Sequence, residues 1–372
     1  MKVSDFDYSF PKEIIAQKPS EKRDHSRLMI LDRKTKAIEH KLFYQVSDYL
    51  NPGDLLVLND TKVIPANIVG VKDGGNARIE VLLVKRIDVE EAFRPPYFGD
   101  LKVAATSNLE SRQVWECLVK PGKRLSVGSK VIFGNGEVIG KVLEKLESGE
   151  QIIEFDGDIE GFMRRKGEIP LPPYINSSII PRPSSLVNRY QTVYAQKEGA
   201  SAAPTAGLHF TQELLDKIKE KGINIAYVTL HTGLATFKPV YAENVEEHKM
   251  YEEYFEVPVE TIKAVREAKR VIAVGTTSVR TLETISVRFP DHPISRSPIP
   301  DHPITGSTNL FIYPGYEFKI VDAIITNFHF PKSTLLMLVS AFAGKDLIFN
   351  AYEEALNDEY RFFSFGDAML IV

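Results

Sequence analysis

The sequence has almost no cysteine, since Cys117 is the only one among its 372 residues. A single cysteine rules out an intrachain disulfide, an iron–sulfur cluster and a zinc site built from cysteines. This scarcity is typical of proteins that work in a reducing compartment.

Long apolar runs are also missing, and we expect no secretory signal at the start of the sequence. The first eight residues carry two acidic side chains and no apolar core, so they do not resemble a secretory signal. The longest apolar stretch, residues 335–343, is far too short to cross a bilayer and predicts a buried helix. We therefore expect a cytoplasmic protein with no membrane association.

The chain has no excess of basic charge, because its formal net charge is −4. This balance argues against a protein that coats nucleic acid in general, but it is compatible with a local basic surface that binds one. Charged runs are usually only solvated faces, whereas basic groups interleaved with tyrosines can follow a phosphate backbone and stack on unpaired bases. The candidate RNA contacts are Lys123, Arg124, Arg164, Arg165, Arg189 and Tyr190.

Residues 71–155 differ from the rest of the chain in their sequence pattern. Their closely spaced strand-like runs, separated by Gly, Pro and Asn turns, predict a small antiparallel β-barrel or sandwich. Elsewhere helices, such as residues 211–221, alternate with buried strands, such as residues 271–274, which predicts an α/β layered fold. We therefore expect an α/β main domain (1–70 and 156–372) interrupted by the inserted β domain.

A short phrase, Pro-Asp-His-Pro-Ile, occurs twice, at residues 290–294 and 300–304. The Pro and Ser content of residues 290–307 predicts a solvated loop. His292 and His302 could bind a metal in principle, but an expanded surface loop is favoured, and we assign it no function.

One turn has a physical reason to bind an anion. A buried strand ends at Val274, and a helix is expected to begin within Gly275-Thr276-Thr277-Ser278, where free backbone N–H groups favour negative charge. Simple capping by Thr or Ser is the alternative, and no Gly-Lys-Ser/Thr follows as a Walker loop requires. Arg280 close behind favours a bound carboxylate or phosphate. Candidate substrate-binding residues here are Thr276, Thr277, Ser278 and Arg280.

Two polar residues, Asn59 and Asp60, directly follow another strand-like run. Residues in this position often orient a ribose hydroxyl or a base edge. An Asx-turn is the alternative interpretation. Both remain open from the residues alone.

Three turn-rich segments, residues 202–211, 228–237 and 325–334, each place a histidine beside Thr and Phe. The histidines are His209, His231 and His329. Histidine titrates near neutral pH and suits proton transfer. The alternatives are a metal triad, which the missing His-Glu-x-x-His spacing makes the weakest, and three structural histidines.

The same segments contain further polar or small residues that we take as candidate substrate-binding residues. These are Thr205 and Gly207 beside the first histidine, and Asn327 before the third.

Long motifs follow one another along nearly the whole chain. They include residues 4–8 (Ser-Asp-Phe-Asp-Tyr), 22–28 (Lys-Arg-Asp-His-Ser-Arg-Leu), 58–61 (Leu-Asn-Asp-Thr), 167–174 (Gly-Glu-Ile-Pro-Leu-Pro-Pro-Tyr), 189–195 (Arg-Tyr-Gln-Thr-Val-Tyr-Ala) and 365–371 (Phe-Gly-Asp-Ala-Met-Leu-Ile). Together with the histidine segments, they closely resemble the S-adenosylmethionine:tRNA ribosyltransferase-isomerase family of queuosine biosynthesis. Lys62 and Asn67 stand where this family usually has arginine, and Tyr251 stands where it usually has a histidine.

This resemblance implies transfer and isomerisation of the ribosyl part of S-adenosylmethionine. The acceptor would be 7-aminomethyl-7-deazaguanine at the tRNA wobble position, and the products epoxyqueuosine-tRNA, adenine and methionine. S-adenosylmethionine would be a substrate, with no prosthetic group and no metal. The three histidines would transfer protons, Arg280 with the Gly275–Ser278 turn would hold a carboxylate or phosphate, and Asn59 and Asp60 would contact ribose or base.

We further expect a monomer. Two other classes remain as alternatives: a non-catalytic RNA-binding module, and an S-adenosylmethionine-dependent tRNA methyltransferase. The missing Gly-x-Gly loop after an early strand weakly disfavours the common Rossmann methyltransferase.

Overall fold

The structure is a computed structural model of the 372-residue chain, and it describes all residues except 88–112, 147–148, 176–187, 234–239, 241 and 289–299. The chain divides into two compact units. Unit 1 consists of Met1–Val63 and Leu171–Val372, and unit 2 of Ile64–Pro170. Unit 2 is thus wider at both ends than the β domain expected over residues 71–155.

Unit 2 is a closed barrel with the strand order β10-β7-β6-β5-β8-β9, in which every neighbouring pair is antiparallel. Its strands are β5 (Asn67–Lys72), β6 (Arg78–Ile87), β7 (Gln113–Lys120), β8 (Lys130–Phe133), β9 (Val138–Lys145) and β10 (Gln151–Asp156). Helix α2 (Ile159–Lys166) follows, with the short 3-10 turns η6 (Gly122–Arg124) and η7 (Gly134–Gly136) between strands. Of the two architectures that the sequence leaves open, the barrel is confirmed.

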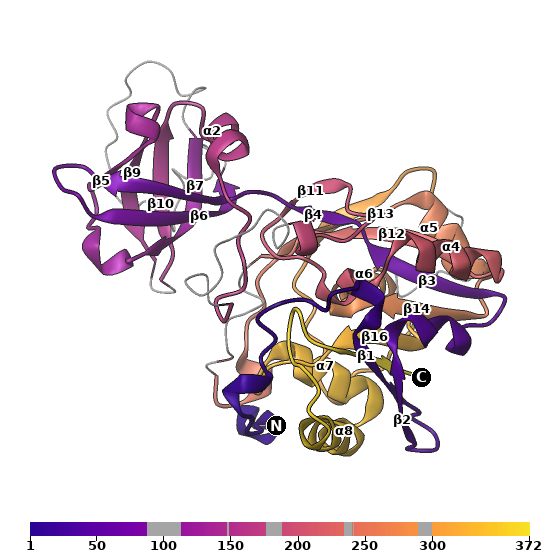
Figure 1. The fold of residues 1–372 in the computed structure, drawn as a ribbon. Coiled ribbons are helices and arrows are strands. Elements are labelled where there is room, and N and C mark those ends of the chain that lie inside the picture. Colours follow the sequence, from indigo (N-terminus) through magenta and orange to yellow (C-terminus); the bar gives the residue numbers. More distant parts are fainter. Residues whose placement is uncertain (88–112, 147–148, 176–187, 234–239, 241, 289–299) are drawn as a thin grey trace. The chain divides into compact units, whose positions relative to one another are not determined.

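Unit 1 is built on a nine-stranded mixed sheet with the order β15-β13-β12-β3-β14-β16-β17-β1-β2 (Figure 1). Its strands are β1 (Arg27–Leu31), β2 (Ile38–Leu42), β3 (Asp54–Asn59), β12 (Asn224–Leu230), β13 (Glu253–Val257), β14 (Arg270–Val274), β15 (Ile304–Thr308), β16 (Ala323–Asn327) and β17 (Ala368–Ile371). A separate parallel pair joins β4 (Thr61–Val63) to β11 (Lys197–Ala200).

The helices of unit 1 match the expected alternation. They are α4 (Gln212–Glu220), α5 (Val259–Glu267), α6 (Gly275–Arg288), α7 (Thr334–Ala343) and α8 (Lys345–Asn357), with 3-10 turns η1 (Val3–Phe6), η2 (Lys12–Ile14), η3 (Arg23–His25), η4 (Phe43–Tyr49), η8 (Thr205–His209) and η10 (Val245–Glu247). Thr211 caps α4 by accepting a hydrogen bond from Leu214 N at 3.1 Å. The α/β class expected for the main domain is confirmed.

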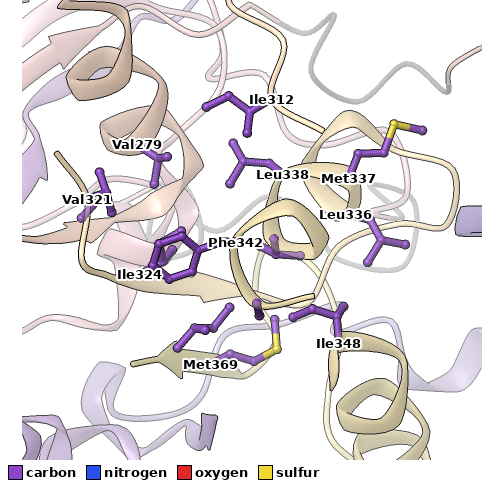
Figure 2. Close-up of a cluster of buried hydrophobic side chains, with 14 of the residues drawn as sticks. Val279, Ile312, Val321, Ile324, Leu336, Met337, Leu338, Phe342, Ile348 and Met369 are labelled. Carbon is purple, nitrogen blue, oxygen red and sulfur yellow. The ribbon is translucent and has the colours of Figure 1, made fainter. Parts of the chain in front are cut away.

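The sheet of unit 1 is buried on both faces, because successive side chains of a strand point to opposite sides. In β3, Leu55 and Val57 join one apolar cluster, whereas Leu56 and Leu58 join the other. Helices α5, α6, α7 and α8 cover the first face, and α4 with η4 covers the second. Figure 2 shows part of the first cluster, where side chains of α6, α7 and α8 meet those of β16 and β17.

Part of the expected solvated loop over residues 290–307 is a strand. Ile304–Thr308 forms β15, which pairs antiparallel with β13 at the end of the sheet. The Pro and Ser content hides this strand, because it is short and only half-buried. Residues 289–299, including His292, lie outside the described residues.

Among the described residues, no single helix is both long and apolar enough to cross a membrane. Helices α7 and α8 satisfy that test only as a pair, and a bend of 114° separates them. Helix α7 is the buried helix expected over residues 335–343, and it contributes to the core of unit 1.

A buried carboxylate fastens α6 to the segment that leads into β16. Glu283 is fully buried, and its oxygens accept hydrogen bonds from the backbone N–H groups of Lys319, Ile320 and Val321, each at 3.0 Å. The hydroxyl of Tyr316 adds a further bond at 3.1 Å. This carboxylate therefore satisfies three backbone donors, of which that of Val321 is buried and those of Lys319 and Ile320 are partly buried.

We expect Glu283→Ala to lower the free energy of unfolding by about 3 kcal/mol, because it removes four hydrogen bonds to a buried carboxylate and leaves the buried N–H group of Val321 unpaired. Urea denaturation followed by circular dichroism measures the change. Glu317→Ala removes a nearby exposed carboxylate that forms an ion pair with Lys319 on the surface, and it should leave the midpoint almost unchanged. Equal midpoints for the two variants would contradict this account of Glu283.

Candidate active site

The carboxyl ends of four neighbouring strands meet at one edge of the unit 1 sheet. Strands β12, β3, β14 and β16 run parallel to one another in that order. The segments that follow them begin at His231, Asp60, Gly275 and Phe328. Ligands of open parallel sheets bind at this edge, and polar candidates from separate parts of the sequence gather here.

His231 is half-buried just beyond the end of β12. Its Nδ1 lies 2.8 Å from Thr61 Oγ1, and its ring stacks on Tyr254 with centroids 5.6 Å apart. Burial, aided by the positive charge of Lys197, lowers the pKa of this imidazole, so it is neutral at physiological pH. A neutral, partly accessible histidine at this edge is able to accept a proton.

Asp60 follows β3 and lies in the same part of the edge. Its Oδ1 accepts a hydrogen bond from Thr229 Oγ1 at 2.6 Å, and burial raises the pKa of the carboxyl. Its neighbour Asn59 is fully buried, and its Oδ1 accepts from the backbone N–H groups of Thr61 and Leu230 at 3.1 and 3.0 Å. For Asn59 these hydrogen bonds match the Asx-turn interpretation, and its side chain joins two strand ends.

His209 ends η8, which packs against the end of β16. Its Nδ1 lies 2.7 Å from Ser26 Oγ, and its ring stacks on Phe43. Burial lowers its pKa to about 3, while the Asn327 amide partly opposes the shift. The Asn327 amide therefore lies close to the His209 ring, and within the described chain neither His209 Nε2 nor Asn327 Oδ1 has another hydrogen-bond partner. Two buried polar atoms, His209 Nε2 and Asn327 Oδ1, therefore lie inside this edge of the sheet.

His329 lies apart from solvent in an aromatic part of the core. Its Nε2 lies 2.9 Å from Thr326 Oγ1, its N–H donates to Tyr352 Oη, and its carbonyl accepts from Tyr8 Oη. Burial lowers its pKa to about 3. With these contacts His329 fits the structural interpretation better than the catalytic one.

At the start of α6, where we expect an anion to bind, some of the hydroxyl groups have hydrogen-bond partners and others do not. Gly275 has φ +84°, which permits the sharp change from β14 to the helix. Ser278 Oγ donates to Val274 O at 2.8 Å, so that hydroxyl is occupied. Among the described residues the buried Thr277 Oγ1 has no partner, and Thr276 lies beside it at the first turn. These two threonines remain suited to an anion.

Arg280 does not point freely at that turn. Its guanidinium forms a buried ion pair with Glu253, and its Nε donates to Leu310 O at 3.1 Å. Glu253 in turn accepts from Gly233 N at 3.2 Å, two residues beyond His231. Arg280 thus holds Gly233 in place through Glu253, and only its Nη2, unpartnered within the described residues, is left for a ligand.

Gly207 in η8 has a packing reason to be glycine. A Cβ at this position would lie 2.0 Å from Tyr194 Oη and 2.8 Å from Thr192 Cγ2. Thr205 begins the same turn, and Ala206 approaches Gly275. The turn therefore brings the first histidine segment against the start of α6.

The expected RNA contacts divide between the two units. Lys123, Arg124, Arg164 and Arg165 are exposed on unit 2, and Arg165 pairs with Glu137. In unit 1, Arg189 donates to the carbonyls of Ser20 and Glu21.

Tyr190 does not provide the expected stacking surface. The side chain is completely buried and packs edge-on against Phe365. No face of its ring is available to a base, so that part of the expectation is wrong.

Three residues that the sequence does not mark as site residues hold the marked ones in place. Ser26 binds His209, Thr61 binds His231, and Glu253 binds Arg280. Ser26 and Thr61 lie inside family-like motifs, which is the one signal that could have found them. Nothing in the sequence distinguishes Glu253.

The part of the chain that the structure describes contains no group of three or more His, Cys, Asp or Glu side chains that could hold a metal ion. The three histidines of the segments have separate partners, so they do not form the metal triad that was one alternative.

Known proteins resemble this chain over its whole length. A family model described as queuosine biosynthesis protein matches residues 3–371. A protein of Halothermothrix orenii named S-adenosylmethionine:tRNA ribosyltransferase-isomerase is 51% identical, and one of the same name from Caldanaerobacter subterraneus subsp. tengcongensis is 49% identical. Both alignments cover 100% of each chain.

A solved structure points the same way. The crystal structure of S-adenosylmethionine tRNA ribosyltransferase from Thermotoga maritima has a TM-score of 0.51 and 39% identity, covering 99% of this chain and 100% of that one. Fold and relatives together define the class, a transferase. The chain belongs to the S-adenosylmethionine:tRNA ribosyltransferase-isomerase family of queuosine biosynthesis. The family, enzyme class and fold class predicted from the motifs are confirmed.

The two deeply buried histidines make a prediction about acid stability. The unfolded chain protonates histidine near pH 6.5, whereas His209 and His329 stay neutral in the fold down to about pH 3. Stability should therefore fall as the pH drops through this window, by about 2 kcal/mol per histidine at pH 5.

Urea denaturation of wild type, His209→Gln and His329→Gln at pH 7.5 and 5 tests this expectation. Each variant should be less stable than wild type at pH 7.5 but lose less stability on acidification. His302→Gln, at an exposed histidine, controls for the loss of an imidazole. An unchanged pH dependence in both buried variants would contradict the burial argument.

Proposed function

We propose that this chain transfers and isomerises the ribosyl moiety of S-adenosylmethionine onto 7-aminomethyl-7-deazaguanine at the wobble position of tRNA. The products are epoxyqueuosine-tRNA, adenine and methionine. The observation that carries the proposal is the meeting of His231, Asp60, the η8 turn and the start of α6 at one sheet edge, in a chain of this family. The names of its relatives support S-adenosylmethionine and tRNA as the two substrates.

The reaction needs a base first. The sulfonium of S-adenosylmethionine acidifies the adjacent C5′ hydrogens, and removal of one proton gives an ylide whose collapse expels adenine. The acceptor amine then attacks C1′, and epoxide formation expels methionine. His231 is the histidine best suited to accept the proton, because it is half-buried, held by Thr61 and neutral.

Departing adenine needs a proton donor. His209 lies beside Asn327 inside the edge and is the second candidate for proton transfer. Because burial lowers its pKa to about 3, its ring is neutral, and the proton for adenine comes from the imidazolium that His231 becomes when it takes the C5′ proton. His329 has a supporting role in the core. Thr276 and Thr277 at the start of α6 hold the methionine carboxylate through the helix N-terminus.

The exposed basic residues of unit 2 contribute RNA affinity. Phosphate contacts position a nucleic acid and make its binding depend on salt. Lys123, Arg124, Arg164 and Arg165 are assigned this role. Cytoplasmic location and the monomeric state stay predictions from the sequence.

Adenine release from S-adenosylmethionine, measured with and without tRNA bearing 7-aminomethyl-7-deazaguanine, tests the function. We expect release only with the modified tRNA, together with a mass gain on it. S-adenosylhomocysteine in place of adenine would make the protein a methyltransferase. Bound tRNA with neither product would make it a binding module.

In the same assay, His231→Gln should lower kcat at least about 100-fold, because general acid–base catalysis contributes that much or more. His209→Gln should also lower kcat, whereas His329→Gln should act mainly through stability. His302→Gln is the matched control at an exposed histidine. Full turnover in all three segment variants would overturn the assignment.

Charge reversal on unit 2 should weaken tRNA binding without changing S-adenosylmethionine binding. We expect a smaller salt dependence of tRNA affinity in each of two double variants, Lys123→Glu/Arg124→Glu and Arg164→Glu/Arg165→Glu. The slope of log affinity against log salt concentration should fall by about one for every tRNA phosphate that the variant no longer neutralises. Lys217→Glu/Lys219→Glu makes an equal charge change on exposed residues of α4. An equally large decrease in the α4 control would show a nonspecific effect of net charge.

A further inference from the structure

Tyr254 and His231 form a stacked pair of rings at the carboxyl edge of the unit 1 sheet, and the Tyr254 ring is partly exposed to solvent. Tyr254 lies in β13, opposite His231, whose backbone N–H donates to the Tyr254 carbonyl at 3.0 Å. The two rings stack nearly in parallel, with 21° between their planes. Tyr254 is 44% exposed, so a large part of its ring faces solvent although it touches the site histidine.

The imidazole beneath this tyrosine is held firmly. Thr61 Oγ1 fixes Nδ1, and Gly199 leaves room for the opposite nitrogen, since a Cβ there would lie 2.7 Å from Nε2. Gly199 has φ +152°, within the range that favours glycine. Stacking uses the face of the imidazole and leaves its nitrogens for hydrogen bonds and proton transfer. The Tyr254 ring therefore packs on an imidazole whose orientation is fixed by Thr61.

Charged groups surround the pair at short range. Lys197 pairs with Glu256 at 2.5 Å, and both act on the pKa of His231. Glu256 and Tyr254 alternate with the buried Glu253 and Phe255, so they project from the same face of β13. Carboxylates accept hydrogen bonds from the N–H edge of a guanine-like base, and an ammonium donates to its carbonyl oxygen.

We propose that Tyr254, supported by His231, is the stacking platform for the unpaired acceptor purine of the tRNA. This assignment rests on the proposed function and names how its RNA substrate is held. An exposed tyrosine suits a base presented by a macromolecule, whereas a small-molecule site encloses most of its ligand. Tyr190 cannot take this role because it is buried, and the open ring belongs to a strand that the sequence does not reveal.

The test uses an anticodon stem-loop with the fluorescent purine 2-aminopurine at the wobble position, because stacking on an aromatic ring quenches its emission. At saturating protein, wild type and Tyr254→Phe should quench, and Tyr254→Ala should not. Tyr251→Ala is the matched control, since Tyr251 is 45% exposed, lies three residues earlier and precedes β13. Thermal melting confirms that each variant is folded.

A kinetic readout separates this role from a structural one. Tyr254→Ala should raise KM for modified tRNA about tenfold or more, with Tyr254→Phe close to wild type. The affinity for S-adenosylmethionine, measured by the thermal shift it causes, should not change.

Two outcomes would overturn the proposal. One is Tyr254→Ala that still quenches and keeps the wild-type KM. The other is a Tyr254→Ala variant that loses affinity for S-adenosylmethionine while quenching persists. That result would show that Tyr254 stacks on the adenine of S-adenosylmethionine instead of on the tRNA base. Wild-type protein that quenches but never releases adenine would refute the proposed function and leave the stacking platform standing.

Discussion

The parallel pairing of β12, β3, β14 and β16 is the constraint on which the site depends. Parallel strands finish at the same edge, so whatever follows them in the sequence is brought together there. His231, Asp60 and Gly275 come from positions far apart along the chain, yet each is the first residue after its strand. The hydrophobic burial that holds the strands side by side thus also assembles the polar groups.

Burial at this edge sets the protonation states as well. Taking an imidazole out of water disfavours its charged form, which lowers the pKa of His209 to about 3. His231 keeps some contact with solvent, and its pKa is lowered because of partial burial and the nearby ammonium of Lys197. Two similar sequence segments therefore supply histidines of different chemical character, and position relative to the core makes the difference.

Local pattern predicted much of this molecule. Alternating apolar residues revealed most barrel strands, and Thr211 marked the start of α4. Contacts between distant residues were beyond it: Ser26 and His209 lie 183 positions apart. Short strands at the end of the sheet, such as β13 and β15, carry little periodicity, so the sequence does not reveal the exposed Tyr254. Tyr190, in contrast, stands beside an arginine in a motif. The residue types indicated the chemistry, but only packing decided which side chains were free.

The chain leaves unit 1 after Val63 and returns at Leu171, and every strand of the nine-stranded sheet comes from outside that interval. Strands β4 and β11, which come before and after the insertion, pair directly with each other. The barrel is therefore a module in the topological sense. Insertion of the barrel at this position, or a change in the length of its loops, leaves the order and the hydrogen bonding of the sheet that carries the candidate site residues unaltered.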